Sequence, residues 1–357
     1  MPKYRFTEIA INSTEKKKPT EADKETYIGL EHLDSGTLTV SRWGSEVAPI
    51  GEKLLMKKGD VLFGKRRAYQ KKVGIAPFDG IFSAHGMVLR PREEVITKEY
   101  FPLFISSDYF LNEAIRISVG SLSPTVNWKD LKDLTFNIPT IEEQRRITPL
   151  VWAAIKAKNA YKSLIQRTDD LVKSQFIEMF GDPNSSRDTV PFEVAFTIRD
   201  DLRKPINDAV RAEMHDGATY PYYGANGQVD TINQYLMDCT ALCLAEDCGA
   251  YGPGEPSSYI VQGKCWVNNH AHVIIPNDNC DLHYANAFFR ILDMRPYVSG
   301  STRLKLTQGK MKEIPVVLPS LDEQKQFARF IEQSDKSKLT SKYNQEVCIC
   351  LQKPILK

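Results

Sequence analysis

Residues 138–147 read Ile-Pro-Thr-Ile-Glu-Glu-Gln-Arg-Arg-Ile, and residues 318–327 read Leu-Pro-Ser-Leu-Asp-Glu-Gln-Lys-Gln-Phe. The second stretch follows the first by 180 positions without a gap, and nearly every aligned residue is identical or chemically similar. Such a stretch is also good helix-initiation chemistry, so chance similarity is an alternative, but chance explains a tripeptide better than an aligned block. A period this long exceeds the roughly 20–50 residues of a solenoid repeat. The pattern therefore predicts two whole domains, each closed by the same element.

Two weaker matches occur in the same order along the chain. Residues 6–19 resemble residues 192–205 at an offset of 186, and residues 83–91 resemble residues 268–276 at an offset of 185. The second match aligns His85 with His270. The offset drifts by a few residues, as expected if insertions and deletions lie in loops. These matches predict one architecture in two copies whose intervening sequence has diverged.

Length and composition fit two ordinary domains. The 357 residues suffice for two hydrophobic cores, and no apolar run approaches the ~20 residues of a membrane span. The first residues contain no apolar signal-peptide region, so we expect a cytoplasmic protein that does not contact a membrane. Seven cysteines, an odd number, indicate reduced thiols rather than a disulfide framework.

The cysteines of the second half allow two interpretations. None lies in the closely spaced Cys-x₂-Cys pairs that are typical of zinc sites. Burial of Cys239, Cys243 and Cys265 in strands is the favoured interpretation, and we expect no metal and no cofactor. The alternative zinc site would draw its ligands from Cys239, Cys243, Cys248, Cys265, His270 and His272.

Short β-branched and aromatic runs punctuated by Gly and Pro alternate with helical segments. Runs such as 60–63, 80–83, 87–90, 240–244 and 271–275 predict strands, and 109–117 and 284–292 predict helices. The fold class is therefore α+β with two duplicated domains. The expected boundaries are a first body at 1–138, a central helix at 139–181, a second body at 182–318 and a C-terminal helix at 319–357.

A long helix is expected after the first body. Thr140 and Glu143 form a capping-box pattern, and Gly181 followed by Pro183 marks the end of the helix. From Gln144 to Phe180 the helix would run about 55 Å at ~1.5 Å per residue. Apolar residues spaced alternately by four and three predict a heptad seam, which Ile147, Val151, Ile165 and Val172 widen. The seam consists of Leu150, Ala154, Ala157, Tyr161, Leu164, Thr168 and Leu171.

The partner of this helix is expected to be the second copy, which begins at Ser320. Pseudo-two-fold symmetry makes the pairing antiparallel, so Phe327, Phe330 and Ile331 should meet the far end of the central helix, near Leu171 and Phe176. The stretch 334–341 is polar and predicts a poorly sealed middle. The tail beyond about Ser341 should be loosely held or packed against another subunit, and a truncated helix is the alternative expectation.

This organisation resembles the specificity (S) subunits of type I restriction–modification systems. The resemblance covers essentially the whole chain, and it includes Gly120-Ser121 and Gly300-Ser301 before each closing block. It implies that each body is a target recognition domain that reads one half of a bipartite, asymmetric DNA sequence. It also implies that the two long helices form an antiparallel spacer that binds two modification (methyltransferase) subunits. Restriction subunits, which carry the translocase and nuclease, would join outside them.

Enzymatic functions are disfavoured. The chain has no Gly-x₄-Gly-Lys-[Ser/Thr] loop, no Asn/Asp-Pro-Pro-aromatic motif of adenine methyltransferases and no G-x-S-x-G elbow. Asp60 and Lys65 could be fitted to a nuclease pattern, but solvated surface charge explains them better. We expect no catalytic residue.

Candidate DNA contacts are basic and aromatic residues in loops. Arg is the commonest reader of guanine, and Asn can read adenine in the major groove. Residues 1–140 carry 21 basic and 18 acidic residues, whereas residues 181–320 carry 12 and 17, so any DNA binding must rest on local patches. The stretch 16–18 suits a solvated turn better than a contact. The candidates are Lys65, Arg66, Arg67, Tyr69, Lys71 and Ser121 in the first body and Tyr222, Tyr223, Asn226, Ser301, Arg303 and Lys305 in the second.

A competing hypothesis is a duplicated scaffold that binds protein or another ligand without DNA specificity. A steep salt dependence of DNA binding would separate the two hypotheses, because counterion release is a property of phosphate contacts. The sequence does not reveal the DNA target or the spacing of its halves.

Overall fold

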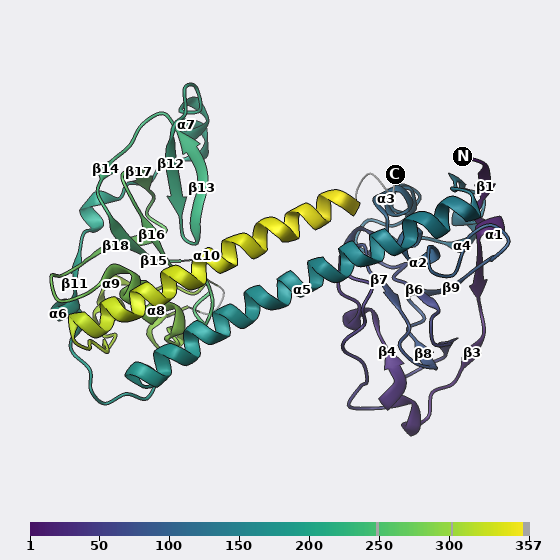
Figure 1. Ribbon diagram of the computed structural model, residues 1–357, viewed down its shortest axis with the longest axis horizontal. Helices are drawn as coiled ribbons and strands as arrows, with labels where there is room; N and C mark the ends of the chain where they lie inside the picture. The colour runs from purple at the N-terminus through teal and green to yellow at the C-terminus, as the bar shows by residue number, and fades with distance from the viewer. Residues whose placement is uncertain (248–249, 301–302, 353–357) are drawn as a thin grey trace. The chain divides into compact units, whose positions relative to one another are not determined.

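The structure is a computed structural model that describes residues 1–247, 250–300 and 303–352. The chain divides into two compact units (Figure 1). The first unit holds Met1–Ala160 and the chain end from Asn344, and the second holds Tyr161–Tyr343. Helix α5 (Ile141–Phe180) contributes residues to both units.

The first unit contains two four-stranded sheets and one two-stranded sheet among its described residues. In spatial order, the first sheet is β2 (Ala10–Ser13), β9 (Met87–Pro91), β6 (Val61–Phe63) and β7 (Val73–Ile75). The second is β3 (Lys16–Lys17), β5 (Lys53–Met56), β8 (Gly80–Phe82) and β4 (Tyr27–Ile28), and the third pairs β1 (Lys3–Arg5) with β10 (Thr135–Asn137). The α-helices are α1 (Phe6–Ile9), α2 (Phe101–Ile105), α3 (Asp108–Arg116) and α4 (Trp128–Leu131).

The second unit also contains two four-stranded sheets among its described residues. The first sheet is β11 (Phe196–Ile198), β18 (Ala271–Pro276), β15 (Ala241–Ala245) and β16 (Ser258–Val261). The second is β13 (Gly227–Ile232), β12 (Tyr220–Gly224), β17 (Lys264–Val267) and β14 (Met237–Asp238). The α-helices are α6 (Phe192–Ala195), α7 (Asp208–Glu213), α8 (Leu282–Ile291), α9 (Gln308–Lys312) and α10 (Leu321–Gln352), of which the part up to Tyr343 belongs to this unit.

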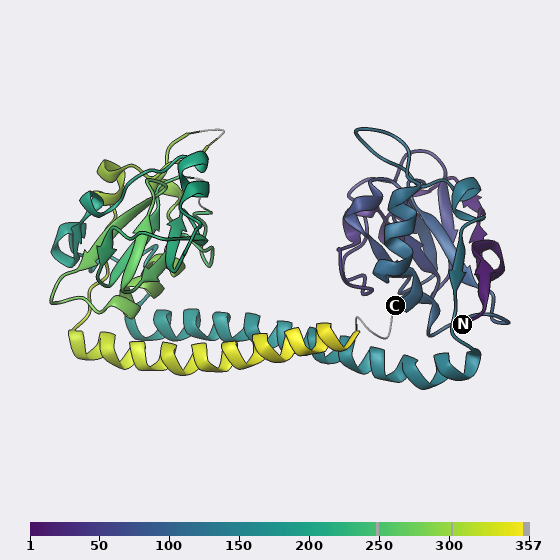
Figure 2. The same ribbon diagram turned by 90° about the horizontal axis from the view of Figure 1, so that it is seen from above.

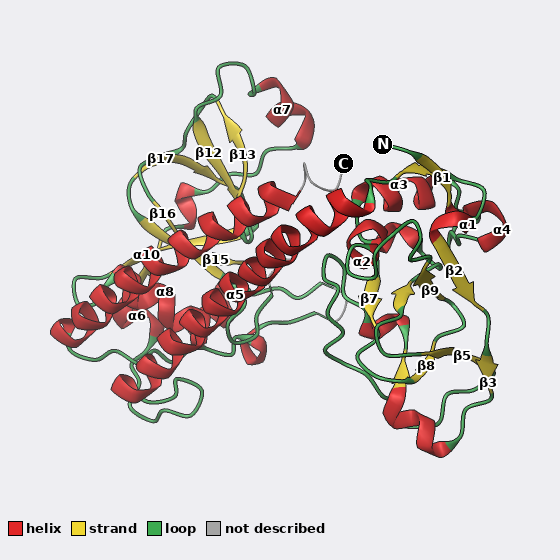
Figure 3. Cartoon of the chain, turned by 45° about the vertical axis from the view of Figure 1, so that its right-hand side comes forward, coloured by secondary structure: helices red, strands yellow, loops and turns green. Residues whose placement is uncertain are grey.

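Burial explains the central strands. All five residues of β15 are buried, because β11, β16 and β18 complete its sheet and α8 packs on β15 and β16 (Figure 3). A strand covered on both faces reads as a continuous apolar run rather than an alternating one. The expected strands at 60–63, 240–244 and 271–275 and helices at 109–117 and 284–292 are confirmed within one or two residues. The segment 37–40, whose composition also suits a strand, forms a single isolated bridge, between Thr39 and Ile75.

The register of the two central sheets aligns the copies residue by residue. Phe63 in β6 lies opposite Met87 in β9, and Leu244 in β15 lies opposite His272 in β18. The parallel pair β4 and β8 has its counterpart in the parallel pair β12 and β17. The duplication predicted from the closing stretches therefore extends through the strand order of the central sheet, whereas in the second sheet the fourth strand is β3 beside β5 in one body and β13 beside β12 in the other.

The closing element is built in the same way in both units. Thr140 and Glu143 form the expected capping box, in which the Thr140 amide donates to Glu143 Oε2 at 2.9 Å. Ser320 and Glu323 repeat it at 3.0 Å. One residue further on, Gln144 and Gln324 are fully buried.

These glutamines tie each long helix to its body. Gln144 Oε1 accepts from the Thr97 amide at 2.7 Å, and its Nε2 donates to the Val95 and Pro139 carbonyls, both at 2.9 Å. Gln324 Oε1 accepts from the Asp281 amide at 2.7 Å, and its Nε2 donates to the carbonyls of Asn279 and Pro319. Each glutamine makes the same three hydrogen bonds to its own body, which explains why the closing stretch is alike in both copies.

The predicted seam of α5 is wrong by one position. Leu150, Leu164 and Leu171 are 61%, 44% and 53% exposed, and Ala154, Ala157 and Tyr161 are only half-buried. The buried line runs instead through Gln144, Thr148, Val151 and Phe176, with Ile155, Ile165 and Val172 half-buried along it. Docking of Gln144 sets this rotation, because a helix residue one position away lies about 100° around the axis.

Within the second unit, α10 runs antiparallel beside the end of α5, as predicted (Figures 1 and 2). Phe327 packs edge-on against Phe176 and Phe180 at 5.5 Å between ring centroids, and Lys338 Nζ lies 3.1 Å from Asp169. Phe327 and Ile331 are buried and Phe330 is partly buried, as expected for the start of the seam.

The middle of α10 is better sealed than its polar sequence predicts. Ser334 and Ser341 are 8% and 3% exposed, and the side chain of Lys338 between them is 13% exposed. Small side chains on a helix face allow close packing, and a long Lys side chain covers apolar surface with its methylene groups. The α-helix continues to Gln352.

Candidate nucleic-acid interface

A basic loop, residues 64–72, follows strand β6 in the first body. The Lys65 carbonyl accepts from the Val126 amide at 2.9 Å, and the Arg67 amide donates to the Pro124 carbonyl at 2.7 Å. These bonds fix the basic loop to the segment 119–125, whose ends are paired through the backbones of Val119 and Thr125. Ser121 is exposed within that segment. The structure thus brings together candidates that lie more than fifty residues apart in the sequence.

The backbone of the basic loop is strained. Arg67 and Lys71 have φ angles of 55° and 50°, and they are the described non-glycine residues with positive φ. They flank a short 3₁₀ turn at Ala68–Gln70, in which Tyr69 is 54% exposed. Left-handed backbone at such residues costs of the order of 1–3 kcal/mol and clusters at functional sites. The strain therefore supports a functional role for this loop.

The loop carries uncompensated positive charge. Lys65, Arg66 and Arg67 form no ion pair with any residue that the structure describes. Arg67 donates to the Ser123 hydroxyl at 3.4 Å, whereas Lys71 pairs with Asp108 at 2.5 Å. Burial, and then the neighbouring Lys16, lower the pKa of Lys65.

His85 lies beside the same charges. Burial lowers the pKa of His85, and Arg66, Lys65 and Lys53 lower it further. Its carbonyl accepts from the Arg66 amide at 3.3 Å. The basic loop, His85 and the segment 119–125 are named here the basic corner. It can attract a polyanion, since its charge has no internal partner.

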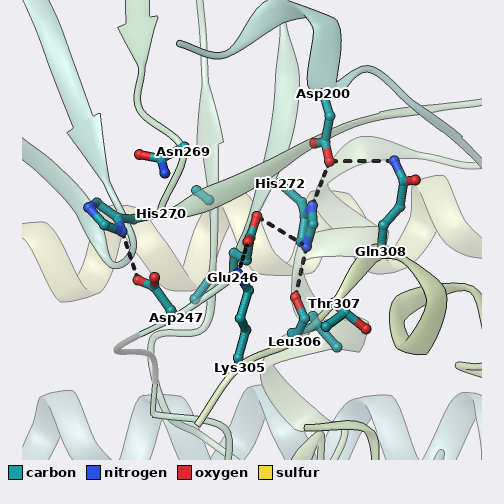
Figure 4. Close-up of polar contacts among 12 residues, drawn as sticks. Asp200, Glu246, Asp247, Asn269, His270, His272, Lys305, Leu306, Thr307 and Gln308 are labelled. Carbon is teal, nitrogen blue, oxygen red and sulfur yellow. Dashed lines mark hydrogen bonds and ion pairs between the residues drawn. The ribbon is translucent and has the colours of Figure 1, made fainter. Parts of the chain in front are cut away.

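The second body reverses the charge at the equivalent positions. Leu244 aligns with Phe63, so Glu246 and Asp247 occupy the places of Lys65 and Arg66. The Glu246 carbonyl accepts from the Leu306 amide at 2.7 Å, as the Lys65 carbonyl does from Val126. We name this cluster, with the basic residues around it, the acidic corner (Figure 4).

Five side chains, from two arginines, one lysine and two histidines, contact the carboxylates of the acidic corner and its neighbour Asp200. Lys305 Nζ lies 2.8 Å from Glu246, Arg303 lies 2.9 Å from Asp247, and His270 Nδ1 lies 2.8 Å from Asp247. Arg203 pairs with Glu246 and with Asp200, the latter at 2.9 Å. The fifth, His272, is buried between Asp200 at 2.7 Å and the Leu306 carbonyl at 2.8 Å (Figure 4).

Electrostatics lower the pKa of Glu246 and Asp200 although both carboxylates are largely buried. Burial alone would raise the pKa of Glu246, but hydrogen bonds from Lys305 and Arg203 outweigh it and lower the pKa. Burial likewise opposes a lowered pKa at Asp200, where the hydrogen bond from His272 prevails. The acids are about 12% exposed at Glu246 and Asp247, whereas Arg303 and Lys305 remain 57% and 50% exposed.

The remaining candidates are dispersed. Tyr222 is 1% exposed and packs under the Arg211 guanidinium at 5.4 Å, so its predicted role as a DNA contact is corrected to a core residue. Tyr223 is half-buried and stacks on Tyr259 at 5.6 Å. Asn226 is exposed in the turn between β12 and β13. Ser301 lies outside the described residues.

The cysteines do not form a metal cluster in the part of the chain that the structure describes. Cys243 and Cys265 are buried in β15 and β17, and burial raises the pKa of Cys265 to about 11. Cys239 is half-buried and follows β14 rather than lying in a strand. Among the described helices, none is long and apolar enough to cross a membrane.

The sequence did not indicate the acids of the second corner, and it indicated the two glutamines only as part of a repeat, not as buried residues. Alignment of the strand 61–63 with 242–244 pairs Lys65 with Glu246, but none of the three aligned strand residues is identical, so the sequence alone does not set this alignment. The repeated Glu-Gln of the closing stretches was the available signal for Gln144 and Gln324.

Comparison with known proteins identifies the family. The family described as "Type I restriction modification DNA specificity domain" matches residues 6–156 and 203–348, which cover most of the chain. The chain belongs to this family.

Two curated relatives carry related names. A Haemophilus influenzae protein described as a type I restriction enzyme specificity subunit is 28% identical over 145 residues, which cover 40% of this chain and 36% of that protein. The type I restriction enzyme EcoDI specificity subunit of Escherichia coli is 24% identical over 182 residues, 49% of this chain and 40% of that protein. The matched region thus spans about two fifths of the length of these relatives.

Solved structures share the fold. A crystal structure of a type I restriction–modification S subunit from M. genitalium superposes with a TM-score of 0.60 at 13% identity, covering 100% of this chain and 95% of that one. A chain from a structure that concerns complex assembly and conformational transition of the type I R-M system gives a TM-score of 0.53 at 17% identity, with 99% and 96% covered. The duplicated α+β architecture with two long helices is therefore shared with S subunits.

Proposed function

We propose that this chain is the non-catalytic, DNA-recognising specificity subunit of a type I restriction–modification system. The observation that carries the proposal is the basic corner, where Lys65, Arg66 and Arg67 have no ionic partner among the described residues. Phosphate contacts by Lys and Arg supply most of the non-sequence-specific affinity for DNA. Arg side chains can also read base edges in the major groove. The family match supports the same role.

The duplication supports a bipartite, asymmetric target. Both bodies keep the strand order of the central sheet, yet equivalent positions carry Lys65 and Arg66 in one and Glu246 and Asp247 in the other. Two bodies that share a central sheet but carry opposite charges at equivalent positions are suited to read different sequences. Each body therefore reads one half of the site, and the spacing of the halves follows from the helices that join them.

The long helices offer surfaces for partner subunits. Leu164 and Leu171 on α5 are 44% and 53% exposed, and Leu339 and Tyr343 on α10 are 69% and 67% exposed. Apolar side chains gathered on a helix surface mark interaction sites more often than chance exposure. These faces dock two modification (methyltransferase) subunits, and restriction subunits join through them. The complex acts in the cytoplasm, where its DNA lies.

Binding and methylation measurements test the proposal. The complex of this chain with its methyltransferase subunits should bind duplex DNA with an affinity that falls steeply with salt, by about 0.9 log units per log unit of salt for each phosphate contacted. Salt-independent binding, or none, would favour the scaffold hypothesis. Methylome sequencing of cells that carry the complex should reveal two short sequences separated by an unread gap. A continuous site would contradict the bipartite arrangement.

A further inference from the structure

The acidic corner of the second body poses an electrostatic problem for a DNA-binding face. Glu246 and Asp247 stand where the first body presents cations, and buried carboxylates near a polyanion oppose its binding. Their ion-pair partners, however, include Arg303 and Lys305, the two described candidates for DNA contact in the segment before α9. Lys305 pairs with Glu246 at 2.8 Å, and Arg303 pairs with Asp247 at 2.9 Å.

The geometry separates the acids from the cations. The carboxylates are 12% exposed, whereas the side chains of Arg303 and Lys305 are 57% and 50% exposed. Backbone bonds between Ser299 and Lys305, at 2.8 and 2.9 Å, fix the base of their segment. The equivalent positions in the first body, Ser123 and Thr125, are uncharged. The two copies have thus exchanged which segment carries the positive charge.

We propose that Glu246 and Asp247 are positioning residues that hold Lys305 and Arg303 in place to contact the second half of the DNA site. The inference rests on the proposed function. The first body contacts its half with the loop after β6, and the second body does so with the segment before α9. An Arg held by a carboxylate loses fewer side-chain conformations on binding, so an ordered guanidinium is a better reader than a mobile one.

The inference predicts a result opposite to that of simple electrostatics. Neutralising two carboxylates in the E246Q/D247N variant should raise the affinity for any DNA if the acids only repel phosphate. If they position cations, the same variant should bind the specific site about tenfold more weakly and lose discrimination in the second half alone. A double variant of two exposed, ion-paired acids elsewhere in the second unit, E193Q/D201N, removes the same charge and should leave discrimination intact.

The experiment uses the complex with methyltransferase subunits and two duplex probes. One probe carries the sequence found by methylome sequencing, and the other carries it with the second half scrambled. A wild-type complex that does not distinguish the probes would refute the proposed function itself. A discriminating wild type with an E246Q/D247N variant of equal or higher specific affinity would refute only the positioning role.

A double-mutant cycle separates positioning from folding. Asp247→Asn, Arg303→Gln and their combination are compared for specific affinity, with thermal unfolding as the second measurement. If Asp247 acts through Arg303, the combined variant should bind no more weakly than Arg303→Gln alone. Additive losses, or a loss of affinity that follows a fall in the unfolding temperature, would overturn the inference.

Discussion

Gln144 in α5 accepts a hydrogen bond from the backbone amide of Thr97 at 2.7 Å, across 47 residues of sequence. The same side chain donates to two carbonyls, and Gln324 repeats the arrangement in the second unit. A buried amide that satisfies three backbone groups is difficult to replace, because every alternative leaves at least one group without a partner. This explains why the Glu-Gln pair is kept in both copies while the bodies have diverged.

We expect Gln324→Ala to destabilise the second unit by about 2–4 kcal/mol, since it leaves a buried amide and two carbonyls unsatisfied. Thermal or urea unfolding of the full chain measures the loss. Gln326→Ala on the same helix is the control, because Gln326 is exposed. Equal stability of the two variants would show that the buried hydrogen bonds contribute little.

The triple change K65A/R66A/R67A should weaken DNA binding and reduce its salt dependence. Each lost phosphate contact lowers the slope by up to about one unit, and an Arg that reads a base pair should cost about 1–3 kcal/mol of discrimination in the first half-site. The control K57A/K58A/K98A removes the same charge from three exposed residues. Lys57 and Lys58 lie just before β6, whereas the basic loop lies just after it. If both triple variants alter the slope equally, net charge rather than the basic corner is responsible.

Exchange of the second body tests modular reading. Replacing residues 190–310 with the corresponding body of another family member should change one half of the methylated sequence. The reason is that each body has its own sheets and its own core. Methylome sequencing gives the result directly. A change in both halves, or in neither, would contradict independent reading.

The sequence predicted the duplication, the strands and the antiparallel helices because these depend on repeated residues and on apolar periodicity. The rotation of α5 could not be predicted in the same way. Leu150 and Val151 are both apolar, and only the burial of Gln144 decides which of them faces the core. A buried polar residue is not recognised by a search for apolar spacing.

The candidate site was predicted less well. Tyr222 lies in an aromatic run that suits base stacking, but its side chain is buried in a small cluster with Met214, Ile232 and Trp266. Glu246 and Asp247 gave no sequence signal for a DNA-binding face because their charge has the wrong sign. Their importance follows from Arg303 and Lys305, which lie 56 and 59 positions away and meet them only in the folded chain.

Charge reversal should test the register of the two long helices. Lys338→Glu places a negative charge beside Asp169 and Asp335, which lie 3.1 and 2.6 Å from the Lys338 ammonium, so it should lower the unfolding temperature. Adding Asp169→Lys should restore part of the loss, with a coupling of about 0.5–1.5 kcal/mol, because one of the two contacts is rebuilt. Glu332→Lys as the second change, in place of Asp169→Lys, should not restore the unfolding temperature, since Glu332 is exposed and pairs with Lys336.

Acid should destabilise the second unit through its ionised carboxylates. The pKa values of Asp200 and Glu246 are lowered from 3.8 and 4.5, because hydrogen bonds from His272, Lys305 and Arg203 outweigh burial. A lowered native pKa means that the unfolded chain binds protons more readily, so the stabilisation is complete above about pH 4.5 and is lost as the pH falls through the native values. Between pH 6 and about pH 3, the unfolding temperature should therefore fall less steeply for Glu246→Gln than for the wild type. The control Glu193→Gln, which removes an exposed carboxylate paired with Lys312, should follow the wild type. A Glu246→Gln variant with the full acid sensitivity would show that the acidic corner does not stabilise the folded second unit.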